Sequence, residues 1–531
     1  MRVFTFDTTL RDGTQGEAVS LSADDKVLVA HKLDELGIDY IEGGWPGSNP
    51  KDKEFFARAK SIQFKHARLT AFGATRMARN SVEEDTSVNA LIEADTPVVC
   101  VFGKTWELHV RKALGITEEE NLKLISDTVR YLKAHGKEVV YDAEHFFDGY
   151  KHSRDFAFRT LEAAHQAGAD TLTLCDTNGG TMTGQIAEIC ADVRKNFAGI
   201  LGIHTHNDCE LAVANALAAV EQGFQHVQGC FNGYGERCGN ANLTSIIANL
   251  ELKMGHSTIG KERLTQLTAA ARFIAELANL PLRGDQAYVG HSAFAHKGGV
   301  HVNAVLKDSN TYEHISPKTV GNRQRVLLSD LSGKGSILYK LKQHGLEDRL
   351  DDAARRHLLD RIKQMEFQGY ELEAAEGTFE LLVREALRPG LNLFEVASYE
   401  VITKATNSTA NVTLKAQDNV LTASATGNGP VNALDVALRQ CLSTLYPAIA
   451  SVELTDYKVR VLDNKKGTAA LVRVLIEWSD RKRSWATVGV SENVIEASWF
   501  ALVDAMRLEL MRLHEDDPNV QKAVEDYCWG V

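Results

Sequence analysis

Two histidines separated by one residue form the pattern with the clearest chemical meaning in this sequence. His204 and His206 end the apolar stretch ILGIHTH, which is typical of a β-strand. Residues two apart in a strand point to the same side, so both imidazoles can face one point. Two histidines and a carboxylate form a common divalent-metal site, and we expect Asp12 as the third ligand and Asn240 as a weaker fourth. The alternative is a pair of histidines that only form hydrogen bonds.

Arg11 precedes Asp12, and the sequence leaves two roles open for it. Its guanidinium could orient the carboxylate through a salt bridge. It could also stabilise negative charge that develops on an oxygen held at the metal. The glycine-rich loop GYGERCGNA at 233–241 lacks the spacing of a dinucleotide or phosphate loop, so we interpret it as a tight turn close to a ligand.

These residues need a scaffold, and the first half of the chain alternates short β-branched runs with amphipathic helical segments. The predicted strands are 3–6, 38–43, 67–73, 97–102, 138–144, 171–175, 200–206 and 226–230. Helical segments between them include 24–36, 118–134, 154–167 and 210–222. Eight such units in about 275 residues predict a closed (β/α)8 TIM barrel, with an open doubly wound sheet as the alternative.

The carboxyl ends of barrel strands carry the functional groups of such folds. In this sequence, polar residues follow six of the eight predicted strands: Asp7, Arg11, Asp12, Glu42, Asp142, Glu144, Asp176, Thr177, Asn178, His204, His206, Glu236, Arg237 and Asn240. We therefore expect the site on one rim of the barrel.

The alternation stops near residue 280. We expect a catalytic barrel over 1–279, helical linker subdomains over 280–375 and a C-terminal α+β regulatory domain over 376–531. The linker includes a charged helical segment at 346–368. In the last domain, strands, a helix at 431–445, further strands and a helix at 493–513 predict two similar halves.

Composition excludes several classes of protein. The 531 residues are 44% hydrophobic and 24% charged, as in ordinary globular proteins. A net charge of −12 argues against nucleic acid or an anionic membrane as partner. Apolar runs such as PVVCVF are too short to span a bilayer. The eight cysteines include no CxxC pair and the start lacks a secretory signal, so we expect reduced thiols and a cytoplasmic location.

Four motifs carry a resemblance to a known family. They are DTTLRDG (7–13), IEGG (41–44), HTHND (204–208) and GYGERCGNAN (233–242). Their order and spacing resemble those of the 2-isopropylmalate, homocitrate and citramalate synthases, which are metal-dependent barrels that condense an acyl-CoA with a 2-oxo acid. The segments 291–305 and 312–337 resemble the family's linker subdomains, and GNGPVNALD (427–435) resembles its regulatory domain.

The resemblance implies roles for individual residues. Asp12, His204 and His206 would be the metal ligands, with Asn240 close by. It further implies that Arg11 stabilises charge and contacts substrate, that Glu144 is the catalytic carboxylate and that Thr177 contacts the substrate carboxylate. From the linker, it implies that His301 and Tyr312 are catalytic residues that complete the partner subunit's site in a homodimer. Asn303 is expected as a substrate contact.

Within the family the sequence is most similar to the citramalate branch. That resemblance implies pyruvate as substrate, acetyl-CoA as cosubstrate and isoleucine as a candidate effector. We expect Trp45 and Phe146–Phe147 to narrow the substrate pocket to fit a methyl group. The alternatives are a 2-isopropylmalate or other 2-alkylmalate synthase, a carbon–carbon lyase on a similar barrel, and an inactive barrel that senses an amino acid.

Overall fold

The computed structural model describes residues 1–305, 307–326, 350–372, 374–388, 390–416, 419–462, 467, 469–479 and 484–514. The chain divides into two compact units. The first contains Met1–Phe294 and Ile315–Arg323, and the second contains Ala295–His314 and Gln324–Val531. Among the described residues, the helices are all too short or too polar to cross a membrane. The bounds of the three predicted domains stay a prediction.

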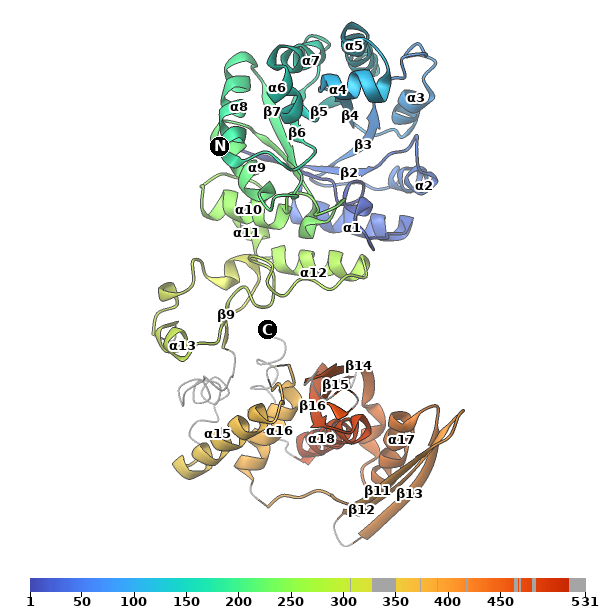
Figure 1. The fold of residues 1–531 in the computed structure, drawn as a ribbon, viewed down its shortest axis with the longest axis vertical. Helices are drawn as coiled ribbons and strands as arrows, with labels where there is room; N and C mark the ends of the chain where they lie inside the picture. Colours follow the sequence, from blue (N-terminus) through green and yellow to red (C-terminus); the bar gives the residue numbers. More distant parts are fainter. Residues whose placement is uncertain are drawn as a thin grey trace. The chain divides into compact units, whose positions relative to one another are not determined.

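Eight parallel strands close into a barrel in the first unit, as predicted, so the open-sheet alternative is wrong (Figure 1). The strands are β1 (Phe4–Asp7), β2 (Tyr40–Gly44), β3 (Arg68–Ala74), β4 (Val98–Lys104), β5 (Glu138–Glu144), β6 (Thr171–Asp176), β7 (Ile200–Thr205) and β8 (His226–Gly229). The order is consecutive, and β8 pairs with β1 to close the ring. Predicted and observed strand ends differ by no more than two residues.

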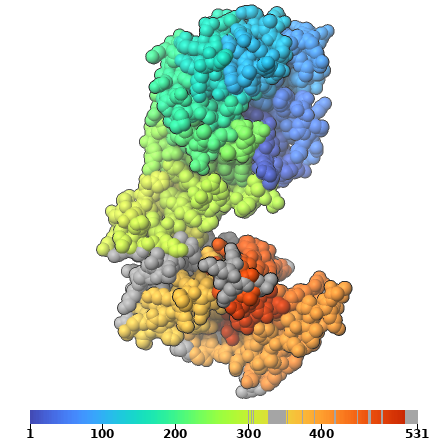
Figure 2. All heavy atoms as spheres, viewed as in Figure 1, coloured from blue at the N-terminus to red at the C-terminus, as the bar shows by residue number. Residues whose placement is uncertain are grey.

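Helices surround the strands of the barrel (Figure 1), and the atoms of this unit, coloured blue to green, are closely packed in the space-filling view (Figure 2). The helices are α1 (Ala23–Leu36), α2 (Pro50–Ala59), α3 (Thr86–Glu93), α4 (Glu107–His109), α5 (Glu118–Ala134), α6 (Phe146–His152), α7 (Arg154–Gln166), α8 (Thr183–Asn196), α9 (Ala212–Glu221), α10 (Leu243–Leu252), α11 (Lys261–Leu264) and α12 (Leu267–Leu277). Helix α1 begins with a capping box between Ser22 and Asp25 and ends at Gly37, whose φ of 89° needs a residue without a Cβ.

Alternate residues of a barrel strand enter two different cores. On β4, Val99 and Val101 belong to the large core between strands and helices. Val98 and Cys100 belong to a smaller cluster that also contains Phe6. Because successive side chains of a strand point to opposite faces, the smaller cluster fills the barrel interior. Polar side chains on this inner face can therefore meet at the carboxyl ends of the strands.

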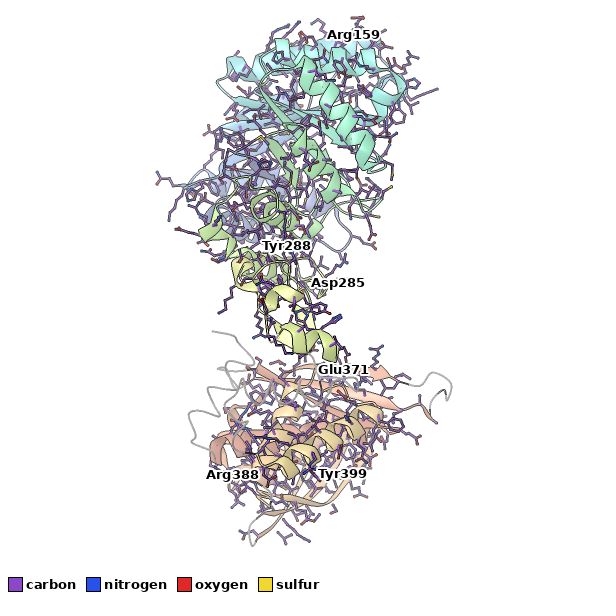
Figure 3. The ribbon with its side chains drawn as sticks, turned by 90° about the vertical axis from the view of Figure 1, so that its left-hand side faces the viewer. Arg159, Asp285, Tyr288, Glu371, Arg388 and Tyr399 are labelled. Carbon is purple, nitrogen blue, oxygen red and sulfur yellow. The ribbon has the colours of Figure 1, made fainter. Side chains whose placement is uncertain are left out.

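The segment after α12 continues over the barrel unit. Tyr288, labelled in Figure 3, donates a hydrogen bond from its hydroxyl to Asn249 Oδ1 (2.9 Å). Its backbone carbonyl accepts a bond of 2.8 Å from the Asn322 side chain. Residues Ile315–Arg323 thereby belong to the first unit although they follow part of the second in sequence.

The second unit begins with short elements and two helices. They are β9 (Ala295–His296), α13 (Gly299–Val305), β10 (Arg325–Val326), α15 (Asp352–Phe367) and α16 (Glu376–Leu387). Helix α15 corresponds to the helical segment predicted at 346–368, of which 346–349 lie outside the described residues. The resembling segment 312–337 also lies partly outside them.

The C-terminal part of the second unit consists of two similar halves, as the sequence predicts. Strands β11 (Glu395–Thr403), β12 (Ser408–Ala416) and β13 (Asn419–Gly427) form one antiparallel sheet followed by α17 (Pro430–Ser443). Strands β14 (Glu453–Val461), β15 (Val472–Ser479) and β16 (Ser484–Ser491) form the other, followed by α18 (Val494–His514). The halves share one core, in which Tyr399 of β11 stacks on Trp499 of α18 with ring centroids 4.7 Å apart.

Candidate active site and metal centre

The structure brings the predicted metal ligands together in the barrel. Asp12, His204 and His206 are buried, and one ligand atom from each lies within 4.8 Å of the other two. His204 Nε2 is 3.3 Å from Asp12 Oδ2 and 3.3 Å from His206 Nε2. His206 Nε2 is 3.9 Å from the same carboxylate oxygen. The cluster therefore joins two nitrogen donors and one carboxylate at a single point.

Asn240 lies beside this cluster because the loop after β8 pairs with the end of β7. An isolated antiparallel bridge joins His206 to Asn240. Asn240 Nδ2 donates a hydrogen bond of 2.7 Å to Asp12 Oδ2. Among the residues that the structure describes, its Oδ1 atom is buried without a hydrogen-bond partner. Asn240 thus offers one further oxygen next to the three predicted ligands.

Two glycines in the loop GYGERCGNA allow its backbone to lie close to the Asn240 side chain and to fold back on itself. Gly235 has a φ of 146°, and a Cβ there would lie 2.5 Å from Asn240 Oδ1. Gly239 has a φ of 86°, and a Cβ there would lie 2.0 Å from the Gly233 carbonyl oxygen. The interpretation of this loop as a tight turn is confirmed by these conformations.

A chain of hydrogen bonds orients His204. Its Nδ1 lies 2.7 Å from Gln228 Oε1, and Gln228 Nε2 donates to Asp142 Oδ1 at 2.9 Å. Because an amide oxygen only accepts, Nδ1 carries a proton, and Nε2 is the nitrogen that faces Asp12. This arrangement is how outer partners fix the tautomer of a metal-binding histidine.

Electrostatics favour an ionised carboxylate and a neutral imidazole in the cluster. Burial by itself would raise the pKa of Asp12, but the Arg11 guanidinium and His204 outweigh it and hold the pKa well below its usual range. Burial, together with the neighbouring His204, lowers the pKa of His206 to about 4. At neutral pH, Asp12 is therefore negative and His206 has a free electron pair.

The donor set fits a divalent cation. A carboxylate, two imidazole nitrogens and the unpartnered amide oxygen of Asn240 form a mixed O/N set, which suits Mn²⁺, Zn²⁺, Mg²⁺ and related ions. Without a cation, the buried amide oxygen of Asn240 has no hydrogen-bond partner among the described residues, which is unfavourable.

Arg11 forms the salt bridge to Asp12 that the sequence left open, and its second possible role, stabilising developing charge, stays a prediction. Its Nη1 lies 3.6 Å from Asp12 Oδ1, and its Nε donates to Glu42 Oε2 at 2.6 Å. The guanidinium carbon lies 3.6 Å from the ring centre of Phe72, within the range of a cation–π contact. Three partners therefore hold a buried positive charge beside the metal ligands.

Glu42 is a buried acid that the sequence placed on the rim without a role. Burial raises its pKa to about 7 despite the attraction of Arg11, and the nearby Asp142 adds to the rise. Its Oε1 atom is buried without a hydrogen-bond partner in the described part of the chain. Glu42 therefore restrains Arg11 through a buried ion pair.

Glu144, the predicted catalytic carboxylate, forms an ion pair with Lys104. The two residues are register partners at the ends of β4 and β5. Lys104 Nζ also lies 5.3 Å from the ring centre of Phe102. Residues 140, 142 and 144 alternate on the inner face of β5, so Glu144 lies on the same strand face as Asp142.

Thr177 lies in the loop after β6, and its hydroxyl oxygen accepts a bond of 2.9 Å from the backbone N–H of His145. The Thr177 backbone carbonyl accepts a bond of 2.9 Å from Arg237, whose guanidinium also binds both oxygens of Asp208. Three rim loops, after β6, β7 and β8, are thus tied together. The Thr177 hydroxyl proton remains available as a donor.

The aromatic prediction is half wrong. Trp45 packs edge-on against Phe72 and Phe102, with ring centroids 5.7 Å apart in each pair. Phe72 and Phe102 stack on each other at 5.4 Å. Phe146 and Phe147 are instead fully buried in the core between strands and helices, because they begin α6. The aromatic wall beside Arg11 consists of Trp45, Phe72 and Phe102.

The predicted linker residues lie in the second unit. The rings of His301, on α13, and Tyr312 stack with centroids 4.2 Å apart. Both side chains are solvent-exposed in the single chain. Asn303 also lies on α13, and its side chain is outside the described part. Their predicted role in a partner's site stays a prediction.

Sequence reasoning missed Gln228, Lys104, Phe72 and Phe102. Gln228 lies two residues after His226 on the inner face of β8, so strand alternation could have identified it. Lys104 falls two residues beyond the predicted end of its strand. The two phenylalanines resemble ordinary core residues until their partners are known.

Comparison with known proteins gives matches along nearly the whole chain. Family models match residues 2–274 (HMGL-like), 288–369 (Homocitrate synthase post-HMGL domain-like) and 373–509 (LeuA allosteric (dimerisation) domain). The chain is 51% identical over 522 residues to an (R)-citramalate synthase of Aquifex aeolicus, which covers 97% of this chain and 99% of that protein.

An (R)-citramalate synthase of Geobacter sulfurreducens is 51% identical over 516 residues, or 96% of this chain and 98% of that protein. A 2-isopropylmalate synthase of Methanocaldococcus jannaschii is 30% identical over 516 residues, or 95% of this chain and 94% of that protein. The two citramalate synthases are therefore more similar to this chain than the 2-isopropylmalate synthase is. The chain therefore belongs to the citramalate synthase branch of the HMGL-like family.

Proposed function

We propose that this protein condenses acetyl-CoA with pyruvate and water to give citramalate and CoA. The observation that carries the proposal is the buried cluster of Asp12, His204 and His206 beside Arg11. The (R)-citramalate synthases that are about half identical over nearly the full length support the choice of reaction.

Asp12, His204 and His206 would hold a divalent ion, with the Asn240 amide oxygen beside them. When bound, such an ion polarises the C2 carbonyl of a 2-oxo acid as a Lewis acid. Manganese, magnesium and zinc all suit this donor set, and we propose Mn²⁺ or Mg²⁺ for the first assays because carboxylate and amide oxygens favour them.

Arg11 stabilises the negative charge that develops on the C2 oxygen of pyruvate when the new bond forms. Glu42 and the Phe72 ring hold the guanidinium before substrate arrives, so little reorganisation is needed during the reaction. The contact with Asp12 adds an orienting role, and both roles considered from the sequence are combined in one side chain.

Glu144 acts as the base that removes a proton from the methyl group of acetyl-CoA. The electron pair of the broken C–H bond forms the enolate, whose carbon bonds to C2 of pyruvate while the π pair of the C2 carbonyl moves to its oxygen. That oxygen then takes up one proton, which balances the proton removed by Glu144, and becomes the hydroxyl group. Water subsequently attacks the thioester carbonyl, the C–S bond breaks, and CoA leaves as a thiol. The Thr177 hydroxyl donates a hydrogen bond to the pyruvate carboxylate, because its oxygen already accepts a hydrogen bond from the backbone N–H of His145.

The aromatic wall selects for a short 2-oxo acid. Trp45, Phe72 and Phe102 pack around one another next to Arg11, which leaves rigid apolar surface for the methyl group of pyruvate. A rigid wall rejects each additional methylene by about 1–3 kcal/mol. We therefore expect 2-oxoisovalerate to be a poor substrate.

The second unit would serve assembly and regulation. We propose a homodimer in which His301, Asn303 and Tyr312 complete the partner's site, supported by the match of residues 373–509 to a dimerisation domain. Isoleucine is the proposed effector of this domain. Calorimetric titration of the full chain with isoleucine checks this role, and the absence of both binding and inhibition at millimolar isoleucine removes it.

The decisive experiment measures thiol release from acetyl-CoA with Mg²⁺ or Mn²⁺ present. Pyruvate, 2-oxobutanoate, 2-oxoisovalerate and 2-oxoglutarate are compared, and each product is identified by mass. Turnover confined to pyruvate and 2-oxobutanoate supports the proposal. A preference for 2-oxoisovalerate would indicate a 2-isopropylmalate synthase, and no thiol release with any acid would favour the lyase or the sensor.

A further inference from the structure

A buried ion pair joins α1 to α2 behind the end of β2. Lys26 is only 2% exposed and pairs with Asp52, which is also buried. Lys26 Nζ additionally donates to the Gly43 carbonyl at 3.1 Å. The second oxygen of Asp52 accepts a bond of 2.8 Å from the backbone N–H of Trp45. Both charged groups therefore bind the backbone of one short segment, Gly43–Trp45.

The two glycines of this segment let the backbone approach the ion pair. Gly44 has a φ of 147°, and a Cβ there would lie 2.3 Å from the carboxyl carbon of Asp52. A Cβ at Gly43 would lie 2.3 Å from the Phe55 ring. The segment Gly43–Trp45 thus packs tightly against α2, and its conformation depends on the side chains of Asp52 and Phe55.

Stability is a poor reason for this arrangement. Desolvation of two charges can cost more than their attraction returns, so a buried ion pair is weak evidence for stabilisation. The same helices already contribute Val29, Leu33, Phe55 and Phe56 to the main core. The charged groups instead fix a backbone conformation, because two of their hydrogen bonds hold the residues on either side of Gly44.

The fixed segment carries Trp45 into the aromatic wall. The indole packs edge-on against both Phe72 and Phe102, with interplanar angles of 87° and 84°. Phe72 in turn holds the Arg11 guanidinium on its face. A small rotation of the segment would move the indole away from both rings and widen the space beside Arg11.

We propose that Lys26 and Asp52 are positioning residues that set the size selectivity of the enzyme by fixing Trp45. The inference rests on the proposed function for its kinetic consequence. Neither side chain contacts the substrate in this scheme. They act through the backbone of Gly43–Trp45, so their loss changes the ratio of activities on two acids more than it changes turnover of the smaller one.

The test replaces both charges together with apolar side chains of similar size, Lys26→Met with Asp52→Leu. Removing one partner alone would leave an uncompensated buried charge, whereas apolar replacement of a whole pair is often neutral for stability. The matched control is Arg76→Met with Asp127→Leu. That pair also fixes a rim loop, because Arg76 donates to the Met77 and Asn80 carbonyls, but the loop carries no residue of the aromatic wall.

The kinetic readout is the ratio of kcat/KM for pyruvate to kcat/KM for 2-oxobutanoate. We expect this ratio to fall about 10-fold in the Lys26/Asp52 double variant, which is within the usual range of discrimination between substrates that differ by one methylene. Turnover of pyruvate should change far less, and the control should keep the wild-type ratio. A folded double variant with an unchanged ratio overturns the proposal.

A second readout does not need activity. The protein is labelled with 5-fluorotryptophan, and the ¹⁹F resonance of Trp45 is assigned from its disappearance in Trp45→Phe. We expect that resonance to shift or broaden in the Lys26/Asp52 variant and to stay in place in the control. If the wild-type chain turns over neither acid, the proposed function fails, while an unmoved Trp45 resonance overturns the positioning role by itself.

Discussion

Replacing Gln228 with leucine should weaken metal binding without removing a ligand. Gln228 Oε1 accepts the hydrogen bond of His204 Nδ1 at 2.7 Å, and Gln228 is fully buried. Leucine fills a similar volume but leaves the Nδ1 proton without an acceptor. Without bound metal the proton can move to Nε2 and bond to Asp12, so keeping it on Nδ1 for metal binding leaves a buried donor unsatisfied, which costs about 1–3 kcal/mol. At about 1.4 kcal/mol per factor of ten, we expect Mn²⁺ affinity to fall roughly 10- to 100-fold.

The assay counts free Mn²⁺ by electron paramagnetic resonance during titration at pH 7. The matched control is Gln286→Leu, which removes another buried amide whose Nε2 donates to Asn232 at 3.1 Å. Circular dichroism checks that both variants are folded. A folded Gln228→Leu protein that binds Mn²⁺ within about twofold of the wild type would refute the reasoning, because the tautomer of His204 would then not depend on Gln228.

Three further changes test other parts of the site. Glu144→Gln should lower the rate of thiol release by about 10²–10⁴-fold, the usual contribution of a general base, while leaving Mn²⁺ binding intact; a variant with near-normal turnover would exclude Glu144 as the base. Trp45→Ala should raise kcat/KM for 2-oxobutanoate relative to pyruvate, and an unchanged preference in the same thiol assay would remove the aromatic wall from the selectivity argument. His226 is fully buried beside Phe6 and Tyr40, and burial lowers its pKa to about 3, with a further contribution from Arg68. Its neutral form is favoured by folding, so its contribution is complete above the unfolded pKa of about 6.5 and is lost as the pH falls towards 3. Urea unfolding between pH 7 and pH 5 should therefore show a loss of up to about 1.4 kcal/mol per pH unit that is missing in His226→Phe; parallel pH profiles for the two proteins would contradict the prediction.

Local patterns were sufficient to predict the scaffold. Strand runs such as EVVYDAE and amphipathic segments such as 118–134 coincide with β5 and α5, because their periods of two and about 3.6 residues reflect which face is buried. Parallel strands place their carboxyl ends together, so polar residues after those strands had to share one rim. That reasoning was enough to predict the Asp12, His204 and His206 cluster.

The same local patterns could not predict the direction of side chains near a strand end. Trp45 directly follows β2, and Phe146 and Phe147 follow β5 by two and three residues, yet the two phenylalanines turn into the outer core with α6. Trp45 instead packs against Phe72 and Phe102, and its backbone N–H donates to Asp52. Side chains that follow two strands of the same barrel therefore point in different directions, and contacts with other elements determine which direction each takes.

By itself, the sequence determined the barrel and predicted the three residues, Asp12, His204 and His206, that cluster inside it as candidate metal ligands. Only the tertiary structure decided which side chains hold those ligands. Asn240 reaches Asp12 across 228 positions of the chain, and Gln228 reaches Asp142 across 86. Hydrophobic periodicity is a property of neighbouring residues and can be observed in the chain directly. A hydrogen bond between distant groups depends on distances of a few ångströms, which exist only after the strands have closed into a ring.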